Sequence, residues 1–172
     1  MELPERKRQR LGGYDYSQNG CYFVTFCTRN RKNLLSTVGK GLALSAPGIV
    51  LSKTGQILNS EIENIPFRFS GTIVEKYVIM PNHVHLLLSI HDTAGASPRP
   101  TVSQIIGACK SMTTRLANIA DHQPGRKIFQ SSFYDEIIRN DTHFLNIWQY
   151  IDSNPAVWQE DEYYSDETEV SP

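Results

Sequence analysis

Apolar positions along the chain follow two different spacings. Residues 21–27 (CYFVTFC) are mostly aromatic or apolar, which predicts a strand buried on both faces. Residues 72–80 and 83–90 predict two more strands. Pro81 and Asn82 separate them, and proline is poorly tolerated inside a central strand, so a tight turn is expected there. The middle of the chain is therefore predicted to form an antiparallel hairpin.

Three other segments carry apolar residues at helical spacing, and they are expected to end near residues 64, 120 and 153. Their predicted caps are Ser52 or Thr54, Thr101 or Ser103, and Asn140 or Asp141. The second helix is expected to turn inward Ile105, Ile106, Cys109, Met112 and Leu116. The third is expected to pack through Phe144, Ile147, Trp148 and Ile151.

The order of elements favours one α+β domain. Residues 33–50 read as an irregular connection with a short strand, and residues 127–139 hold a last strand-like stretch. Strands separated by helices also occur in parallel α/β proteins, but the central hairpin favours a ferredoxin-like or RRM-like, mostly antiparallel sheet with helices packed on it. We place the domain at 1–158, with a basic arm over 1–18, and predict an acidic, disordered tail over 159–172.

Composition narrows the class of protein. The 172 residues are 40% hydrophobic and 20% charged, as in a soluble globular domain. No apolar run approaches the roughly 18 residues that span a bilayer, and the charged N-terminal residues do not resemble a secretion signal. Three scattered cysteines, Cys21, Cys27 and Cys109, argue against a disulfide framework or a zinc ribbon. A cytoplasmic protein is expected.

The net charge of −1 hides an asymmetry. Six of the 18 acidic residues lie in 160–172, which has no Lys or Arg, so the remainder has 17 basic and 12 acidic residues. Basic residues gather near the N-terminus, at Arg6, Lys7, Arg8 and Arg10, and again at Arg29, Arg31 and Lys32. Such residues can neutralise phosphates, or they can form a solvated arm, and charge alone does not decide between the two.

Two residue pairs carry candidate chemistry. His83 and His85 share one face of a strand, where two imidazoles can grip one divalent ion, unless they are two ordinary surface histidines. Zinc sites usually need three or four protein ligands, so a two-histidine site completed by oxygen ligands favours Mg²⁺ or Mn²⁺. Tyr150 and Asn154 lie four apart on one flank of the last helix. They can also be read as a boundary residue and a cap before Pro155.

Several segments together resemble a known family. Residues 77–88 (YVIMPNHVHLLL) resemble the HUH signature of single-tyrosine, single-strand DNA transposases. Further segments resemble the subgroup of REP-associated tyrosine transposases: 10–25 (RLGGYDYSQNGCYFVT), 110–114 (KSMTT), 128–140 (IFQSSFYDEIIRN) and 150–158 (YIDSNPAVW). The likeness runs in the expected order from about residue 6 to residue 158.

The resemblance implies roles for individual positions. His83 and His85 match the metal-binding histidines of the family, Tyr150 matches its nucleophile, and Asn154 matches an amide-bearing third metal ligand. Tyr134 is the alternative nucleophile. Contacts with DNA are expected from basic residues in the family-like regions: Arg6, Lys7, Arg8, Arg10, Lys110 and Arg139.

The implied function is that of a Mg²⁺- or Mn²⁺-dependent single-strand DNA endonuclease and strand transferase. Such an enzyme cleaves hairpin-forming palindromic repeats through a 5′-phosphotyrosine intermediate and rejoins the strands, as a monomer or a homodimer. Two alternatives remain from the residues themselves. One is a non-catalytic nucleic-acid-binding module, and the other is a metal phosphodiesterase that uses water as its nucleophile.

Overall fold

The computed structural model of the chain describes residues 19–39, 48–91 and 100–165. The basic arm predicted over 1–18 and the last part of the acidic tail, 166–172, lie outside the described residues. The same holds for four of the expected DNA-contacting residues: Arg6, Lys7, Arg8 and Arg10.

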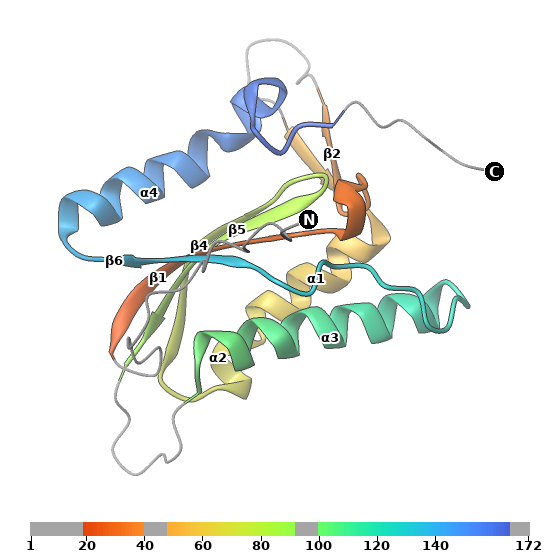
Figure 1. Cartoon of the computed structure of the whole chain (residues 1–172), viewed down its shortest axis with the longest axis horizontal. Coiled ribbons are helices and arrows are strands. Elements are labelled where there is room, and N and C mark those ends of the chain that lie inside the picture. Colours follow the sequence, from red (N-terminus) through yellow and green to blue (C-terminus); the bar gives the residue numbers. More distant parts are fainter. Residues whose placement is uncertain (1–18, 40–47, 92–99, 166–172) are drawn as a thin grey trace, which may run out of the picture.

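A four-stranded antiparallel sheet in the order β4-β5-β1-β6 forms the centre of the fold (Figure 1). The strands are β1 (Gly20–Cys27), β4 (Thr72–Ile79), β5 (His83–Ile90) and β6 (Tyr134–Ile138). In this order β5 lies between β1 and β4, and β1 lies between β5 and β6, which is the split β-α-β arrangement of ferredoxin-like folds. The predicted α+β class and the central hairpin are confirmed.

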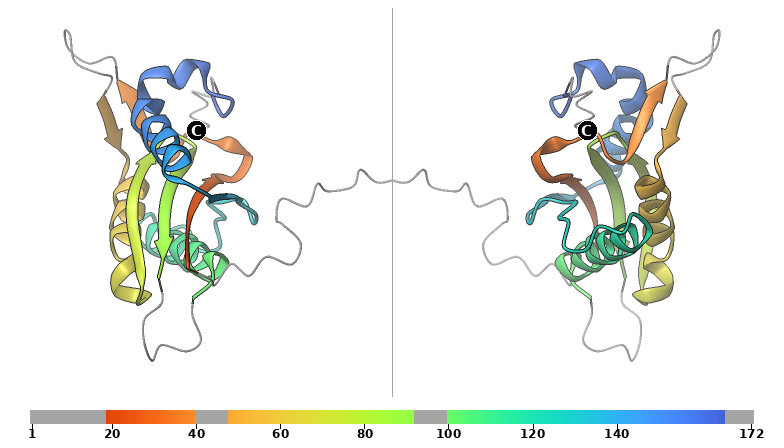
Figure 2. Two further views of the ribbon diagram at one scale, coloured as in Figure 1. Left: turned by 90° about the vertical axis from the view of Figure 1, so that its left-hand side faces the viewer. Right: turned by 90° about the vertical axis from the view of Figure 1, so that its right-hand side faces the viewer.

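Helices cover both faces of the sheet, and the two faces have different contents (Figures 1 and 2). On one face lie α1 (Lys53–Glu63), α2 (Ile65–Arg68) and α3 (Val102–Ala120), over the larger apolar core. On the other face lie α4 (Asp141–Ser153) and the 3-10 helix η2 (Asn154–Glu160), over a smaller core. No helix among the described residues is both long and apolar enough to cross a membrane.

Each long helix begins at a capping residue that the sequence predicted. The Ser52 hydroxyl accepts a hydrogen bond from the Gly55 amide, and the Asn140 side chain accepts one from the His143 amide. Thr101 forms a reciprocal capping box with Gln104 at the start of α3. Because these bonds satisfy backbone N–H groups that have no partner within the helix, they fix where each helix starts.

The inward face of α3 differs from the prediction at Leu116, which is 37% exposed. The buried face passes instead through Thr113 and Ala117. Thr113 can be buried because its hydroxyl donates to the Cys109 carbonyl one turn earlier, at 2.8 Å. A polar residue that satisfies its own hydrogen bond therefore replaces the leucine in the core.

Two segments are more ordered than the sequence indicated. The connection predicted over 33–50 contains β2 (Ser36–Gly39) and β3 (Gly48–Leu51), which pair with each other in a separate small sheet. Residues 159–165, predicted as the start of a disordered tail, pack against the main sheet. They are held there because the buried side chain of Asn82 donates to the Tyr163 carbonyl at 2.7 Å.

Two helical glycines give opposite expectations for stability. A Cβ atom at Gly55 would lie 1.9 Å from the Leu35 carbonyl oxygen, whereas one at Gly107 would have no atom within 4 Å. We expect Gly55→Ala to lower the free energy of unfolding by about 1–3 kcal/mol, because backbone must shift. Gly107→Ala should raise it by about 0.5–1 kcal/mol, since alanine loses less backbone entropy. Denaturant titration measures both, and a Gly55→Ala protein as stable as the wild type would contradict the packing described here.

Candidate metal and tyrosine site

The alternation of β5 points His83 and His85 toward α4 and η2, while Val84 and Leu86 point into the larger core. Both histidines are buried, at 0% and 1% exposure, so they are not ordinary surface residues. The register of the sheet places Cys27 opposite His83 and Thr25 opposite His85. The pair therefore lies beside the end of β1, at the edge of the covered face.

Hydrogen bonds orient both imidazole rings. The Asn82 amide nitrogen donates to two carbonyl oxygens, those of Arg31 at 3.1 Å and Tyr163 at 2.7 Å. Its oxygen, 2.9 Å from His83 Nδ1, must therefore be the acceptor. The proton of His83 is thus on Nδ1, which leaves a lone pair on Nε2. His85 Nδ1 lies 2.7 Å from the Thr25 hydroxyl, and the two Nε2 atoms lie 3.1 Å apart.

Both rings are neutral at physiological pH. Burial lowers the pKa of His83 to about 3, and the nearby charge of Arg31 acts in the same direction. Burial also lowers the pKa of His85 to about 3, with a further contribution from His83 that Asp161 opposes. Neutral imidazoles with converging Nε2 atoms are the form in which histidine binds metal ions.

Asp161 adds a carboxylate to the histidine pair. Its side chain is 2% exposed, and its Oδ2 lies 3.9 Å from His83 Nε2. The ligand atoms of His83, His85 and Asp161 all lie within 4.8 Å of one another. Two imidazole nitrogens and a carboxylate oxygen form a donor set that could hold a divalent cation.

Asn154 lies next to this cluster and has an unsatisfied acceptor. Its amide nitrogen donates to Asp161 Oδ2 at 3.0 Å, and the residue is 1% exposed. Its Oδ1 is buried and has no hydrogen-bond partner among the described residues. A buried amide oxygen without a partner is costly, and a cation ligated by that oxygen would remove the cost. The residues present therefore fit a bound metal ion.

Tyr150 extends from α4 to the same cluster. Its hydroxyl lies 3.3 Å from His85 Nε2, and its ring packs edge-on against Phe23 with the centroids 6.0 Å apart. Lys76 holds α4 in place, with Nζ 2.7 Å from Asp152 Oδ1 and 4.5 Å from the Trp148 ring centroid. The structure thus brings together the four residues that the sequence singled out: His83, His85, Tyr150 and Asn154.

The phenol of Tyr150 is protonated in this arrangement. Burial raises its pKa, and the negative charges of Asp161 and Glu162 add to the effect, while the Asn154 side chain opposes it. Because the side chain is still 38% exposed, the hydroxyl remains open to a molecule arriving from solution. A protonated phenol is a weak nucleophile, so attack by Tyr150 requires activation.

Tyr134 and Tyr163 also lie on the histidine side of the sheet. Tyr134 is paired with Thr25 on β6, two strands from His85 and therefore roughly 10 Å away, and its hydroxyl donates to Glu136 Oε2 at 3.2 Å. Tyr163 packs over His83 with the ring centroids 4.6 Å apart. Its pKa is raised by burial first and by Glu162 next. Tyr150, in contrast, places its hydroxyl at hydrogen-bond distance from a cluster nitrogen, His85 Nε2.

The other predicted DNA contacts within the described residues are not part of this cluster. Lys110 is on α3, across the sheet, where Nζ donates to the carbonyls of Ser131 and Ser132 at 3.3 Å. Arg139 is exposed just before α4. It lies about 15 Å along the helix axis from Tyr150, which is ten residues after the N-cap.

Sequence reasoning missed two residues of the cluster. Asn82 was assigned only to a turn, although it lies inside the quoted MPNHVH segment. Asp161 was counted among six acidic residues of a supposed tail, and nothing in its spacing distinguished it from the others. Its position became evident only from the course of η2, which returns the chain to the histidines.

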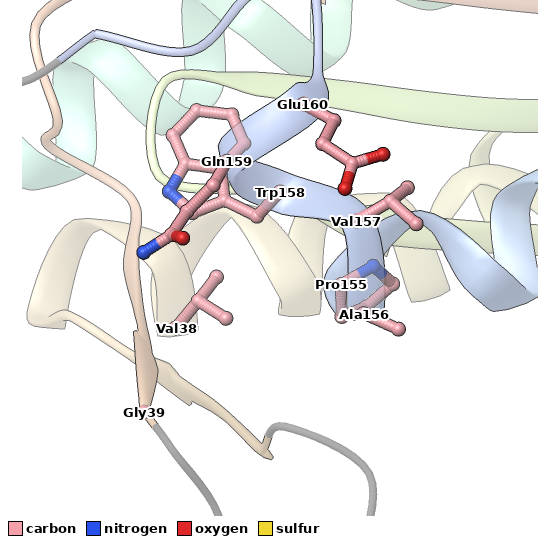
Figure 3. A pocket seen from close by; sticks show the side chains of 8 residues that line it. All are labelled: Val38, Gly39, Pro155, Ala156, Val157, Trp158, Gln159 and Glu160. Atoms are coloured by element: carbon pink, nitrogen blue, oxygen red, sulfur yellow. The ribbon is translucent and has the colours of Figure 1, made fainter.

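A separate small pocket opens beside the cluster, between β2 and η2 (Figure 3). Its volume is about 240 Å³, and its lining consists of Val38, Gly39, Pro155, Ala156, Val157, Trp158, Gln159 and Glu160. Trp158 forms part of the wall and also packs toward His83, with ring centroids 5.8 Å apart. The pocket therefore adjoins the histidine pair without including its ligand atoms.

Comparison with known proteins identifies the family of this chain. Residues 17–154 match the model of the IS200-like transposases, and the chain belongs to this family. It is 28% identical over 184 residues to a Haemophilus influenzae protein described as uncharacterized. This alignment covers 95% of this chain and 96% of that protein. The fold is shared with a REP-associated tyrosine transposase solved with a REP hairpin, at a TM-score of 0.59 and 19% identity, over 85% of this chain and 72% of that one.

We expect the cluster to bind Mn²⁺ through the carboxylate of Asp161, which the sequence did not identify as a ligand. Asp161→Asn keeps the shape of the side chain but removes its charge, so the affinity for Mn²⁺ should fall roughly tenfold or more. Calorimetric titration measures the affinity, and thermal unfolding checks that the variant remains folded. His91→Gln, at an exposed position just after β5, is the matched control and should bind like the wild type. Equal affinities for Asp161→Asn and the wild type would exclude Asp161 as a ligand.

Proposed function

We propose that this transposase-family protein is a divalent-metal-dependent single-strand DNA endonuclease and strand transferase, with Tyr150 as its nucleophile. The observation that carries the proposal is the position of the Tyr150 hydroxyl, 3.3 Å from His85 Nε2 and in contact with the side chain of Asn154, whose oxygen is unsatisfied. His83, His85, Asp161 and Asn154 would hold Mg²⁺ or Mn²⁺. When bound, such an ion polarises a phosphate oxygen and makes the phosphorus more electrophilic.

The residues of the chain position the reacting groups. The Tyr150 oxygen forms a bond to phosphorus, and the bond from phosphorus to the 3′ oxygen breaks. Over the whole step the phenol loses its proton and the leaving 3′ oxygen gains one, so the products are a 5′-phosphotyrosine and a free 3′-OH. The energy of the phosphoester is kept, and a second 3′-OH can reverse the step and rejoin strands without ATP.

A single strand fits this site better than a duplex. The Tyr150 hydroxyl lies 3.3 Å from His85 Nε2, and the residue is only partly exposed. A flexible strand can bring a phosphate to such a partly buried hydroxyl at a lower cost than stacked, paired DNA. The structural relative was solved with a REP hairpin, which supports a hairpin-forming repeat as the substrate. We propose the basic arm, with Arg6, Lys7, Arg8 and Arg10, together with Lys110 and Arg139, as further contacts to the DNA.

The nucleophile can be tested by trapping the covalent intermediate. Wild-type protein incubated with a 5′-tailed hairpin oligonucleotide and Mn²⁺ should give an adduct that survives SDS and maps to Tyr150 by mass spectrometry. Tyr150→Phe should form none, because the ring is kept and only the hydroxyl is lost. Its stability should change by at most about 1.5 kcal/mol, the value of one hydrogen bond.

Two matched variants serve as controls. Tyr134→Phe and Tyr163→Phe each remove one phenolic oxygen on the same side of the sheet, and both proteins should still form the adduct. An adduct that persists in Tyr150→Phe and disappears in Tyr134→Phe would reassign the nucleophile. Cleavage without any adduct would favour water as the nucleophile, and binding without cleavage would favour a non-catalytic module.

A further inference from the structure

A short basic turn follows β1 directly beside the histidine cluster. Because Cys27 pairs with His83, the residues after Cys27 continue past the metal-binding end of β5. They form the 3-10 helix η1 (Arg29–Arg31) and end in Lys32. Arg29, Arg31 and Lys32 are all exposed, so three cationic residues lie at this end of the sheet.

The backbone of this turn is strained. Asn30 and Arg31 have φ angles of 57° and 53°, in the left-handed region that residues with a Cβ atom rarely adopt. Such conformations persist only where the surroundings enforce them, and they concentrate at functional sites. An arginine in this conformation therefore calls for a reason beyond local folding.

The strained turn and the histidine pair are held by the same side chain. The Asn82 amide donates to the Arg31 carbonyl at 3.1 Å, and its oxygen accepts from His83 Nδ1 at 2.9 Å. Thr28 is completely buried, and its hydroxyl donates to the Lys32 carbonyl at 2.8 Å while its backbone amide donates to the Asn82 carbonyl at 2.8 Å. The distance between the basic turn and the cluster is therefore fixed by hydrogen bonds that are buried or partly buried.

The Arg31 side chain leans toward the cluster. Its guanidinium carbon lies 5.1 Å from the centroid of the Tyr163 ring, and that ring covers His83. Its Nη1 also donates to the Glu162 carbonyl at 3.1 Å. The Tyr163 ring and the Glu162 carbonyl orient the guanidinium without neutralising its charge. The positive charge therefore lies next to His83, separated from it by the Tyr163 ring.

We infer that Arg31, with Arg29 and Lys32 beside it, binds backbone phosphates of the single strand next to the phosphate that is cleaved. The inference rests on the proposed function and deepens it, since it names the surface that positions the substrate. An arginine fork suits a phosphate, and a turn locked to the metal-binding histidine fixes the spacing between the contacted phosphate and the scissile one. The strain at Asn30 and Arg31 is then the cost of that fixed placement.

The test separates strain from charge. In a Tyr150→Phe background without metal, the affinity for a labelled 5′-tailed hairpin is measured by fluorescence anisotropy at several salt concentrations. Arg31→Gly accepts the left-handed backbone but loses the cation and its contacts with Tyr163 and Glu162. Because these effects on stability oppose each other, its Tm should change little while its DNA affinity falls several-fold. The slope of log affinity against log salt should become shallower by about 0.7. Asn30→Gly relieves strain at the adjacent position and keeps every cation, so Tm should rise with binding unchanged.

Further variants keep the inference open to contradiction. Arg31→Gln should repeat the loss of affinity if Arg31→Gly folds poorly. Arg115→Gln removes an exposed arginine of α3 on the opposite face, and it should bind like the parent protein. An unchanged affinity and slope in both Arg31 variants, or an equal loss in Arg115→Gln, would overturn the inference while leaving the proposed function intact. A parent protein that does not bind the hairpin would overturn both.

Discussion

A completely buried amide must find a partner for each of its polar atoms, and Asn82 meets this requirement through contacts with separate parts of the chain. Its side chain binds the His83 ring, the Arg31 carbonyl and the Tyr163 carbonyl, and its own carbonyl accepts from Thr28. A tight turn between two strands supplies this amide at a fixed position. The orientation of a histidine, the path of a basic turn and the return of the C-terminal segment therefore depend on one side chain.

The two faces of the sheet divide stability from chemistry. One face packs its apolar residues against α1 and α3, and most of the fully buried aliphatic side chains lie there. The other face buries histidines, a carboxylate and an amide under α4 and η2, an arrangement that costs free energy wherever hydrogen bonds are incomplete. Because side chains alternate along a strand, one strand can serve both faces. On β5, Val84 packs in the larger core, while His83 and His85 form the cluster on the opposite face.

What the sequence could predict followed from local spacing. A period of two placed His83 and His85 on one face, and a separation of four placed Tyr150 near Asn154, because both patterns depend only on neighbouring residues. The position of Asp161 depends instead on the course of η2. It also depends on Asn82, 79 positions earlier in the chain, whose side chain binds the carbonyl of Tyr163. Composition alone made the segment look solvated, since six acids without a lysine or arginine are typical of a tail. A hydrogen bond to a backbone carbonyl far along the chain leaves no periodic pattern in the sequence.

The direction of α4 has an electrostatic consequence for the cluster. The helix runs from Asp141 to Ser153, so its carboxyl end, with the partial negative charge of its last carbonyl groups, is the end that carries Tyr150. No lysine or arginine lies in that last turn to offset the helix dipole. The dipole favours a cation among the histidines and repels a phosphate that arrives alone. The helix that supplies the phenol thus also makes the approach of an anion depend on a positive charge already present.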